Sequence, residues 1–160
     1  MRRGLAGLVA AGCLLASAGC GGNAHQGDAR RVDREWVDNT AGVIDQLQRD
    51  LVLGSASGES LAAARKALRS GLYTLLVAYT DFGGCRHMVA SAGLAPERFA
   101  KVTRPLRVAC SRLERAAALF TRAASGDDAP ALVEAERLAT SAAPLLVRAR
   151  EELQAAATTR

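Results

Sequence analysis

The sequence predicts an all-α fold. Aromatic residues make up only 4% of the 160 residues, whereas Ala, Leu, Arg and Glu, which favour helices, are abundant. Along four segments, apolar residues recur at intervals of three and four, the period of one helix face. Short turns rich in Gly, Ser or Pro separate the segments. We therefore expect an up-down-up-down four-helix bundle whose third and fourth helices are kinked.

The first two helices are expected over residues 30–53 and 58–81. The apolar stripe of the first helix contains Val32, Trp36, Val43, Leu47 and Leu51. A Gly/Ser run at residues 54–58 ends this helix and begins the second. The stripe of the second helix consists of Leu61, Ala64, Leu68, Leu72, Leu75 and Tyr79. The glycine pair at residues 83–84 then stops it.

A connector at residues 85–95 precedes the third helix, which begins near Pro96. We expect one or two helical turns at residues 86–92, ended by Gly93. The third helix has the most regular stripe of the chain, consisting of Phe99, Val102, Leu106, Ala109, Leu113, Ala116 and Phe120. Pro105 lies inside this unbroken period, which favours a kink over a new helix.

The fourth helix is expected to begin after an N-cap at Asp127 or Asp128. Its predicted stripe consists of Leu132, Ala135, Leu138, Ala142, Leu145, Ala149 and Leu153, with Pro144 as a second kink. With short turns between successive helices, the first and fourth helices should lie side by side.

The first twenty residues have the order of an export signal. Arg2 and Arg3 precede an apolar run at residues 5–18, which is shorter than the roughly 20 residues that a membrane-spanning helix needs. The ending Ala16-Ser17-Ala18-Gly19-Cys20 resembles the lipobox of bacterial lipoproteins, although Ser17 replaces the leucine usual in that family. The resemblance implies that the Cys20 thiol carries a diacylglycerol and becomes the first mature residue.

This resemblance divides the chain into three parts. Residues 1–19 are the signal, residues 20–29 a flexible Gly-rich tether, and residues 30–158 the bundle domain. The protein is then exported and anchored to the cell membrane or outer envelope through lipid. Without Arg2 and Arg3 the chain has 19 basic and 16 acidic residues, too balanced a charge for a nucleic-acid-binding protein.

Two of the four cysteines, Cys85 and Cys110, remain in the expected domain. In an exported protein such a pair predicts a disulfide. An alternative is a copper(I) site formed by Cys85, His87 and Met88, which would require Cys85 to be free.

No pattern of catalytic or cofactor-binding residues is present. The sequence lacks zinc-ligand spacings, a nucleophile elbow, a phosphate loop and a dinucleotide fingerprint. No Glu-x-x-His pair occurs that would form a di-metal site in a bundle. We therefore expect no enzyme activity, no cofactor and no metal.

The remaining surface feature is the basic face of the third helix. Arg104, Arg107, Arg115 and Arg122 lie opposite the apolar stripe, as either a solvated surface or a contact for anionic lipid or an acidic partner. We expect an interaction or structural module with an unknown envelope partner. The alternative is a small-molecule-binding lipoprotein with an apolar pocket between the kinked helices.

Overall fold

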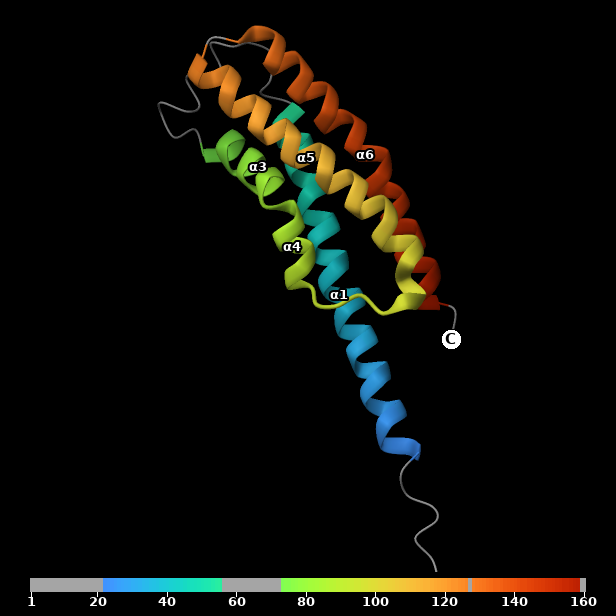
Figure 1. Cartoon of the computed structure of the whole chain (residues 1–160). Coiled ribbons are helices and arrows are strands. Elements are labelled where there is room, and N and C mark those ends of the chain that lie inside the picture. Colours follow the sequence, from blue (N-terminus) through green and yellow to red (C-terminus); the bar gives the residue numbers. More distant parts are fainter. Residues whose placement is uncertain (1–21, 56–72, 127, 159–160) are drawn as a thin grey trace, which may run out of the picture.

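The computed structural model describes residues 22–55, 73–126 and 128–158, and within these ranges every regular element is a helix (Figure 1). The elements are α1 (Gly22–Ser55), α3 (Tyr73–Gly83), α4 (Cys85–Ser91), a 3₁₀ turn η1 (Glu97–Phe99), α5 (Ala100–Gly126) and α6 (Ala129–Thr158). The predicted all-α class is confirmed for the described part of the chain. The expected signal, Cys20 and residues 58–72 of the second predicted helix lie outside it.

Helices α5 and α6 form the longest packed pair and run in opposite directions (Figure 1). Asp128 connects them, because its Oδ1 accepts the N–H of Ala131 at 3.0 Å and its Oδ2 lies 3.0 Å from Arg122 Nε. An N-cap of this kind satisfies a donor that the first helical turn leaves free. Of the two predicted caps, the structure therefore has Asp128 in this role.

The predicted stripe of α5 is confirmed residue by residue. All seven of its members are buried, from Phe99 in η1 to Phe120 near the far end of α5. Helix α5 is continuous across Pro105, which is itself buried. The loss of one backbone donor is tolerated there because the apolar face on both sides of the proline stays packed.

The stripe of α6 differs from the prediction at one position. Leu146 is fully buried, whereas Leu145 is only half-buried. The actual core positions are Ala142, Leu146, Ala149 and Leu153, which still follow spacings of four and three. Two adjacent leucines satisfied the period almost equally, so the sequence alone did not separate them. Helix α6 is also continuous across its proline, Pro144.

Helix α1 begins at Gly22, eight residues before the predicted start, so residues 22–29 are helical. They contain no proline, and an established helix continues through such a stretch more easily than it starts anew. Val32 is 52% exposed although it belongs to the predicted stripe, because this end of α1 extends past α5 and α6 (Figure 1). The division into signal, tether and bundle domain stays a prediction.

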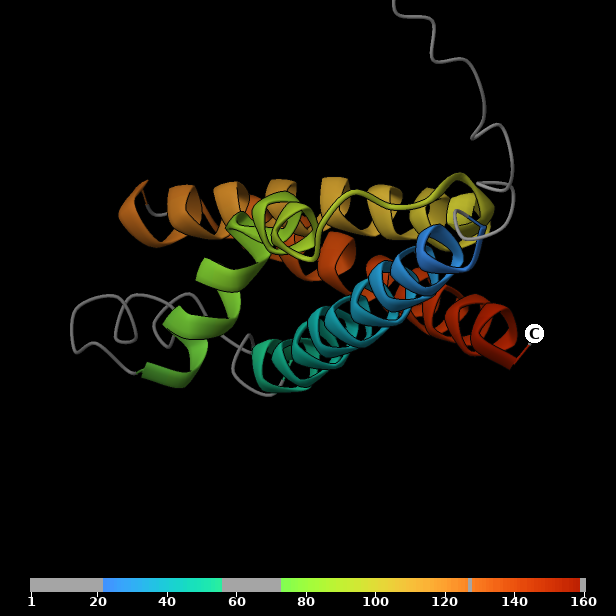
Figure 2. The same ribbon diagram turned by 90° about the horizontal axis from the view of Figure 1, so that it is seen from below.

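Two contacts fasten α1 to the start of α5. The Trp36 ring packs on Phe99 with centroids 4.6 Å apart, and Arg98 forms an ion pair with Asp33. Farther along, α1 packs against α6 and α3, which confirms the predicted contact between the first and last helices. Seen from below, α1 runs obliquely across α6 rather than parallel to it (Figure 2).

The connector contains the predicted short helix. α4 runs from Cys85 to Ser91, and Gly93 has a φ of 101°, a left-handed conformation that glycine adopts without a Cβ clash. Residues 92–96 then lead to η1 and the start of α5. The chain thereby returns along the side of the molecule before α5 begins (Figure 1).

Candidate ligand-binding groove

An apolar groove of about 480 Å³ lies between α1, α3 and α6. Leu51 and Val52 line it from α1, Phe82 from α3, and Ala143 and Val147 from α6. The small side chains explain why the space exists. Alanines along α6 and Gly54 on α1 bring little volume to a place where three helices meet, so the larger neighbours cannot close it.

Tyr79 and Phe82, two of the residues that line the groove, belong to a cluster of packed aromatic rings. Tyr79 of α3 lies parallel to Phe120 of α5, with ring centroids 3.9 Å apart and an interplanar angle of 12°. Phe82 meets Tyr79 edge-on at 5.2 Å. A Cβ added to Gly54 would lie 3.5 Å from the Phe82 ring, so α1 closely approaches this cluster. Such packing holds the rings in fixed positions.

A few polar groups face this apolar surface. Gln48, Glu136 and Thr140 line the groove together with the Tyr79 ring. Burial, and secondarily the negative charge of Glu136, raise the pKa of Tyr79 to about 12, so its hydroxyl stays protonated at physiological pH. The arrangement combines a large apolar area with a small number of orienting polar groups, as in ligand pockets generally.

Beside the groove lies a buried carboxyl group that the sequence reasoning missed. Asp50 is 1% exposed, and the Gln46 amide donates to both of its oxygens at 3.0 and 3.2 Å. The same amide nitrogen lies 3.4 Å from Asp81 Oδ2 on α3. A signal was available, because Asp50 lies three residues after Leu47 and so falls on the inward face of α1.

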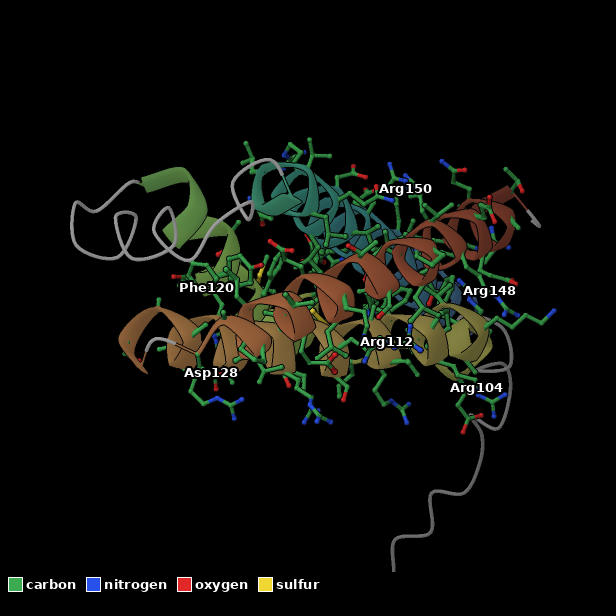
Figure 3. The ribbon with its side chains drawn as sticks, turned by 90° about the horizontal axis from the view of Figure 1, so that it is seen from above. Arg104, Arg112, Phe120, Asp128, Arg148 and Arg150 are labelled. Carbon is green, nitrogen blue, oxygen red and sulfur yellow. A yellow bond between two sulfur atoms is a disulfide. The ribbon has the colours of Figure 1, made fainter. Side chains whose placement is uncertain are left out.

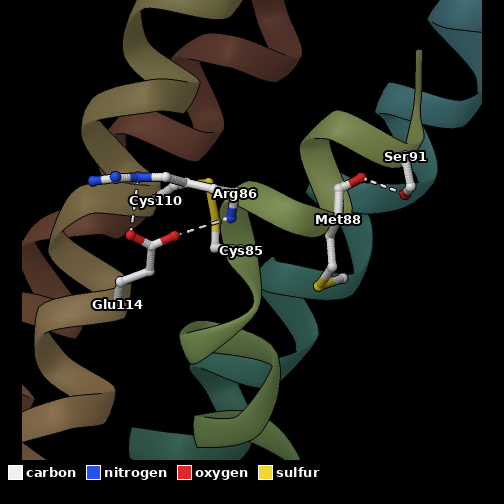
Figure 4. The surroundings of a disulfide bond; sticks show 6 residues. All are labelled: Cys85, Arg86, Met88, Ser91, Cys110 and Glu114. Carbon is white, nitrogen blue, oxygen red and sulfur yellow. Dashed lines mark hydrogen bonds and ion pairs between the residues drawn. A yellow bond between two sulfur atoms is a disulfide. The ribbon is translucent and has the colours of Figure 1, made fainter.

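The predicted cysteine pair is joined. Cys85 at the start of α4 and Cys110 in the middle of α5 form a disulfide with Cα atoms 5.2 Å apart (Figure 4). Beside it, the Arg86 Nε and Glu114 Oε2 atoms form an ion pair at 2.9 Å, and the Arg86 backbone N–H donates to Glu114 Oε1 at 3.2 Å. These contacts attach the start of α4 to α5.

The copper alternative is contradicted at its first ligand. It required a free Cys85 thiol, and that sulfur is bonded to Cys110. His87 is exposed, while Met88 lies beside residues of α1. Across the described ranges, no group of three His, Cys, Asp or Glu side chains is arranged to hold a metal ion.

Comparison with protein-family models, curated proteins and solved structures found no match. The function must therefore be argued from the groove and the surface of this chain.

The four arginines of the predicted surface contact are in different surroundings. Arg104 and Arg107 are exposed and make no ion pair with any described residue, and Arg104 points away from the helices (Figure 3). Arg122 is paired with Asp128. Arg115 lies near Glu134, whose pKa is lowered mainly by the hydrogen bond from Arg137 and in part by the charge of Arg115.

Cys20, the predicted lipidation site, lies outside the described residues. In the ranges that are described, no helix has the length and apolar character needed to cross a membrane.

Proposed function

We propose that this chain is a lipid-anchored helical domain of the cell envelope that binds a small apolar molecule in the groove between α1, α3 and α6. The observation that carries the proposal is the apolar groove itself, which the aromatic side chains of Tyr79 and Phe82 line. Its volume of about 480 Å³ falls within the roughly 300–1,000 Å³ of known ligand pockets. Aromatic or branched aliphatic compounds fit its chemistry.

The polar groups limit how the ligand would be oriented. Gln48 and Thr140 offer neutral hydrogen-bonding groups at the edge of the apolar surface, and the protonated Tyr79 hydroxyl lies at the aromatic side. A neutral compound with one polar end would place that end toward these groups and its body along Leu51, Val52 and Val147. The negative charge of Glu136 disfavours an anionic ligand.

Binding of the neutral dye Nile red tests this proposal. The full chain carrying Cys20→Ala serves as the parent, so that no attached lipid competes for the dye. Ala143→Trp fills the groove from α6 and should raise the dissociation constant at least tenfold. Val133→Trp adds the same ring to an exposed position of the same helix and should leave the constant unchanged. Equal binding by both variants would place the dye elsewhere and overturn the proposal.

The lipid anchor rests on the lipobox-like ending at Cys20. Lipidation there would attach the chain to the cell membrane or outer envelope through the start of α1. Detergent partitioning of wild type and Cys20→Ala tests whether Cys20 carries a lipid. Wild type should enter the detergent-rich phase and the variant should not. Recovery of both in the detergent-poor phase would contradict the anchor.

We also propose an up-down-up-down four-helix bundle for the domain, in which α3 and α4 together take the place of the second helix. The alternating directions of α1, α3–α4, α5 and α6 in Figure 1 support it. The buried Pro105 and the exposed Pro144 are the positions where the third and fourth helices would bend.

A second candidate function is an interaction module that uses the basic edge of α5. It is favoured by the exposed guanidinium groups of Arg104 and Arg107, which form no ion pair within the described part of the chain. Co-sedimentation of the Cys20→Ala chain with phosphatidylcholine vesicles containing phosphatidylglycerol tests this. Arg104→Gln with Arg107→Gln should abolish binding, whereas Arg122→Gln with Arg137→Gln, which removes two ion-paired charges, should weaken it less. Absence of binding by the parent would contradict this candidate.

A further inference from the structure

The carboxyl groups of Asp50 and Asp81 meet between α1 and α3. Asp50 is almost completely buried, and the Gln46 Nε2 atom contacts both of its oxygens and one oxygen of Asp81 at 3.0–3.4 Å. A single side-chain amide therefore connects the two acids. Because Gln46 Oε1 accepts a hydrogen bond from Arg49 Nη2 at 2.7 Å, the amide nitrogen is directed toward the carboxyl groups.

The buried Asp50 carboxyl binds a proton more readily than an exposed acid does. Oxygens of Asp50 and Asp81 lie 3.0 Å and 3.4 Å from the same Gln46 amide nitrogen, and ionised carboxylates have only acceptor atoms. Burial, followed by the neighbouring Asp81 carboxyl, raises the pKa of Asp50 from 3.8 to about 6, while the contacts with Gln46 and Arg49 oppose the rise. Near neutral pH the proton leaves, and two like charges then occupy a buried contact.

The acid pair lies where two walls of the groove join. Leu51, which follows Asp50, lines the groove from α1, and Phe82, which follows Asp81, lines it from α3. The chain just beyond α3 is fixed to α5 by the disulfide at Cys85. A weakened contact between α1 and α3 would therefore change the distance between these two groove walls, while the end of α3 stays attached to α5.

Among the residues that the structure describes, the charged groups of the surrounding helices do not offset a second negative charge at this contact. On α1, Arg49 acts on Asp50, but its side chain is exposed to solvent. On α6, Arg150 pairs with Asp45 at 3.2 Å, and Glu136 is itself an acid. On α4, Arg86 pairs with Glu114 of α5.

We propose that a proton on the buried Asp50 carboxyl, which faces Asp81 across the Gln46 amide, controls ligand binding in the groove. With the proton in place, α1 and α3 are held together and the groove keeps the shape that binds an apolar molecule. Loss of the proton loosens the contact between α1 and α3, and the ligand is released. This inference rests on the proposed binding function. Coupling to one proton makes the dissociation constant rise by up to about tenfold per pH unit in the range where Asp50 titrates.

Nile red binding from pH 5 to pH 8 tests the inference, with the Cys20→Ala chain as parent. The parent should bind the dye most tightly at pH 5 and at least tenfold more weakly at pH 8, with the change centred near pH 6. Asp50→Asn should bind tightly at every pH, because its amide accepts from Gln46 and donates to Asp81 as the protonated acid does. Asp81→Asn, which removes the neighbouring carboxylate, provides a second variant for the same measurement. Asp38→Asn, at an exposed site of α1, should show the same pH dependence of dye binding as the parent.

A ligand-free measurement separates this inference from the binding function. Amide hydrogen exchange of α3, corrected for the intrinsic effect of pH, should show protection that falls near pH 6 in the parent and not in Asp50→Asn. Dye affinity independent of pH would overturn proton control and leave the groove as a binding site. Dye binding absent at every pH, with the exchange result as expected, would overturn the binding function alone. Unchanged exchange would overturn the inference whatever the dye does.

Discussion

Tyr79 of α3 stacks on Phe120 of α5 with ring centroids 3.9 Å apart. The contact joins α3 to the packed pair of α5 and α6 and involves Tyr79, which lines the groove. Phe120 is 2% exposed, so Phe120→Ala should lower the free energy of unfolding by about 3–5 kcal/mol. Urea denaturation measures this. Val108→Ala, at an exposed position of the same helix, should change it by less than about 0.5 kcal/mol. Similar losses of unfolding free energy in both variants would show that the stacked Phe120 ring stabilises the fold no more than an exposed side chain does.

The disulfide should contribute strongly to stability. It joins residues 25 positions apart, and closing a loop of that length stabilises a fold by roughly 3–4 kcal/mol in the chain-entropy model. The double variant Cys85→Ala with Cys110→Ala should therefore unfold at lower urea concentration than the parent. A thiol titration of the unfolded, unreduced chain provides the control. Reactivity of both cysteines there would show that the bond is absent from the protein.

Stability should depend on pH through Asp50. Its pKa is raised to about 6 in the folded chain, so the folded state binds this proton more tightly than the unfolded state does. The resulting stabilisation is fully present below about pH 4 and is lost as the pH rises through about 6. At pH 7.5 Asp50→Asn should melt at a higher temperature than the parent, and the two should converge toward pH 4. A difference in melting temperature between the two chains that stays the same at every pH would contradict the raised pKa of Asp50.

Thr40 offers a simple stabilising substitution. Its hydroxyl is buried in α1 and has no hydrogen-bond partner among the described residues. Because valine has the same shape without the polar group, Thr40→Val should raise the free energy of unfolding by about 1 kcal/mol. Thermal denaturation reports the change. Thr40→Ala, which also removes the hydroxyl but leaves a cavity, should not give this gain. Destabilisation by Thr40→Val would show that the hydroxyl makes a contact in solution.

The buried stripe of a helix could be predicted where only one set of apolar residues fits the helical period. The stripe from Phe99 to Phe120 has no competing register, and all of it is buried. On α6 the adjacent Leu145 and Leu146 offered two solutions of nearly equal period, and only packing selects Leu146. Val32 fits the period of α1 but is 52% exposed, and the end of α1 to which it belongs extends past α5 and α6.

The candidate groove was less accessible to sequence reasoning. The prediction located a pocket at Pro105 and Pro144. The groove borders the Pro144 region through Ala143 and Val147, while Pro105 does not line it. Its volume depends on how closely three helices approach, which a pattern of alanines does not specify. The pairing of Arg122 with Asp128 likewise depends on the turn that brings two helix ends together.

Methyl NMR shows whether an apolar ligand occupies the groove. A neutral apolar compound such as Nile red is titrated into the Cys20→Ala chain at pH 5, with the methyl groups of Leu and Val isotopically labelled. We expect saturable shifts at Leu51, Val52 and Val147, which line the groove, and none at Val108 or Val133, which are exposed elsewhere. Shifts centred on Val108 or Val133, or no saturable shift at the groove methyl groups, would contradict ligand binding in the groove.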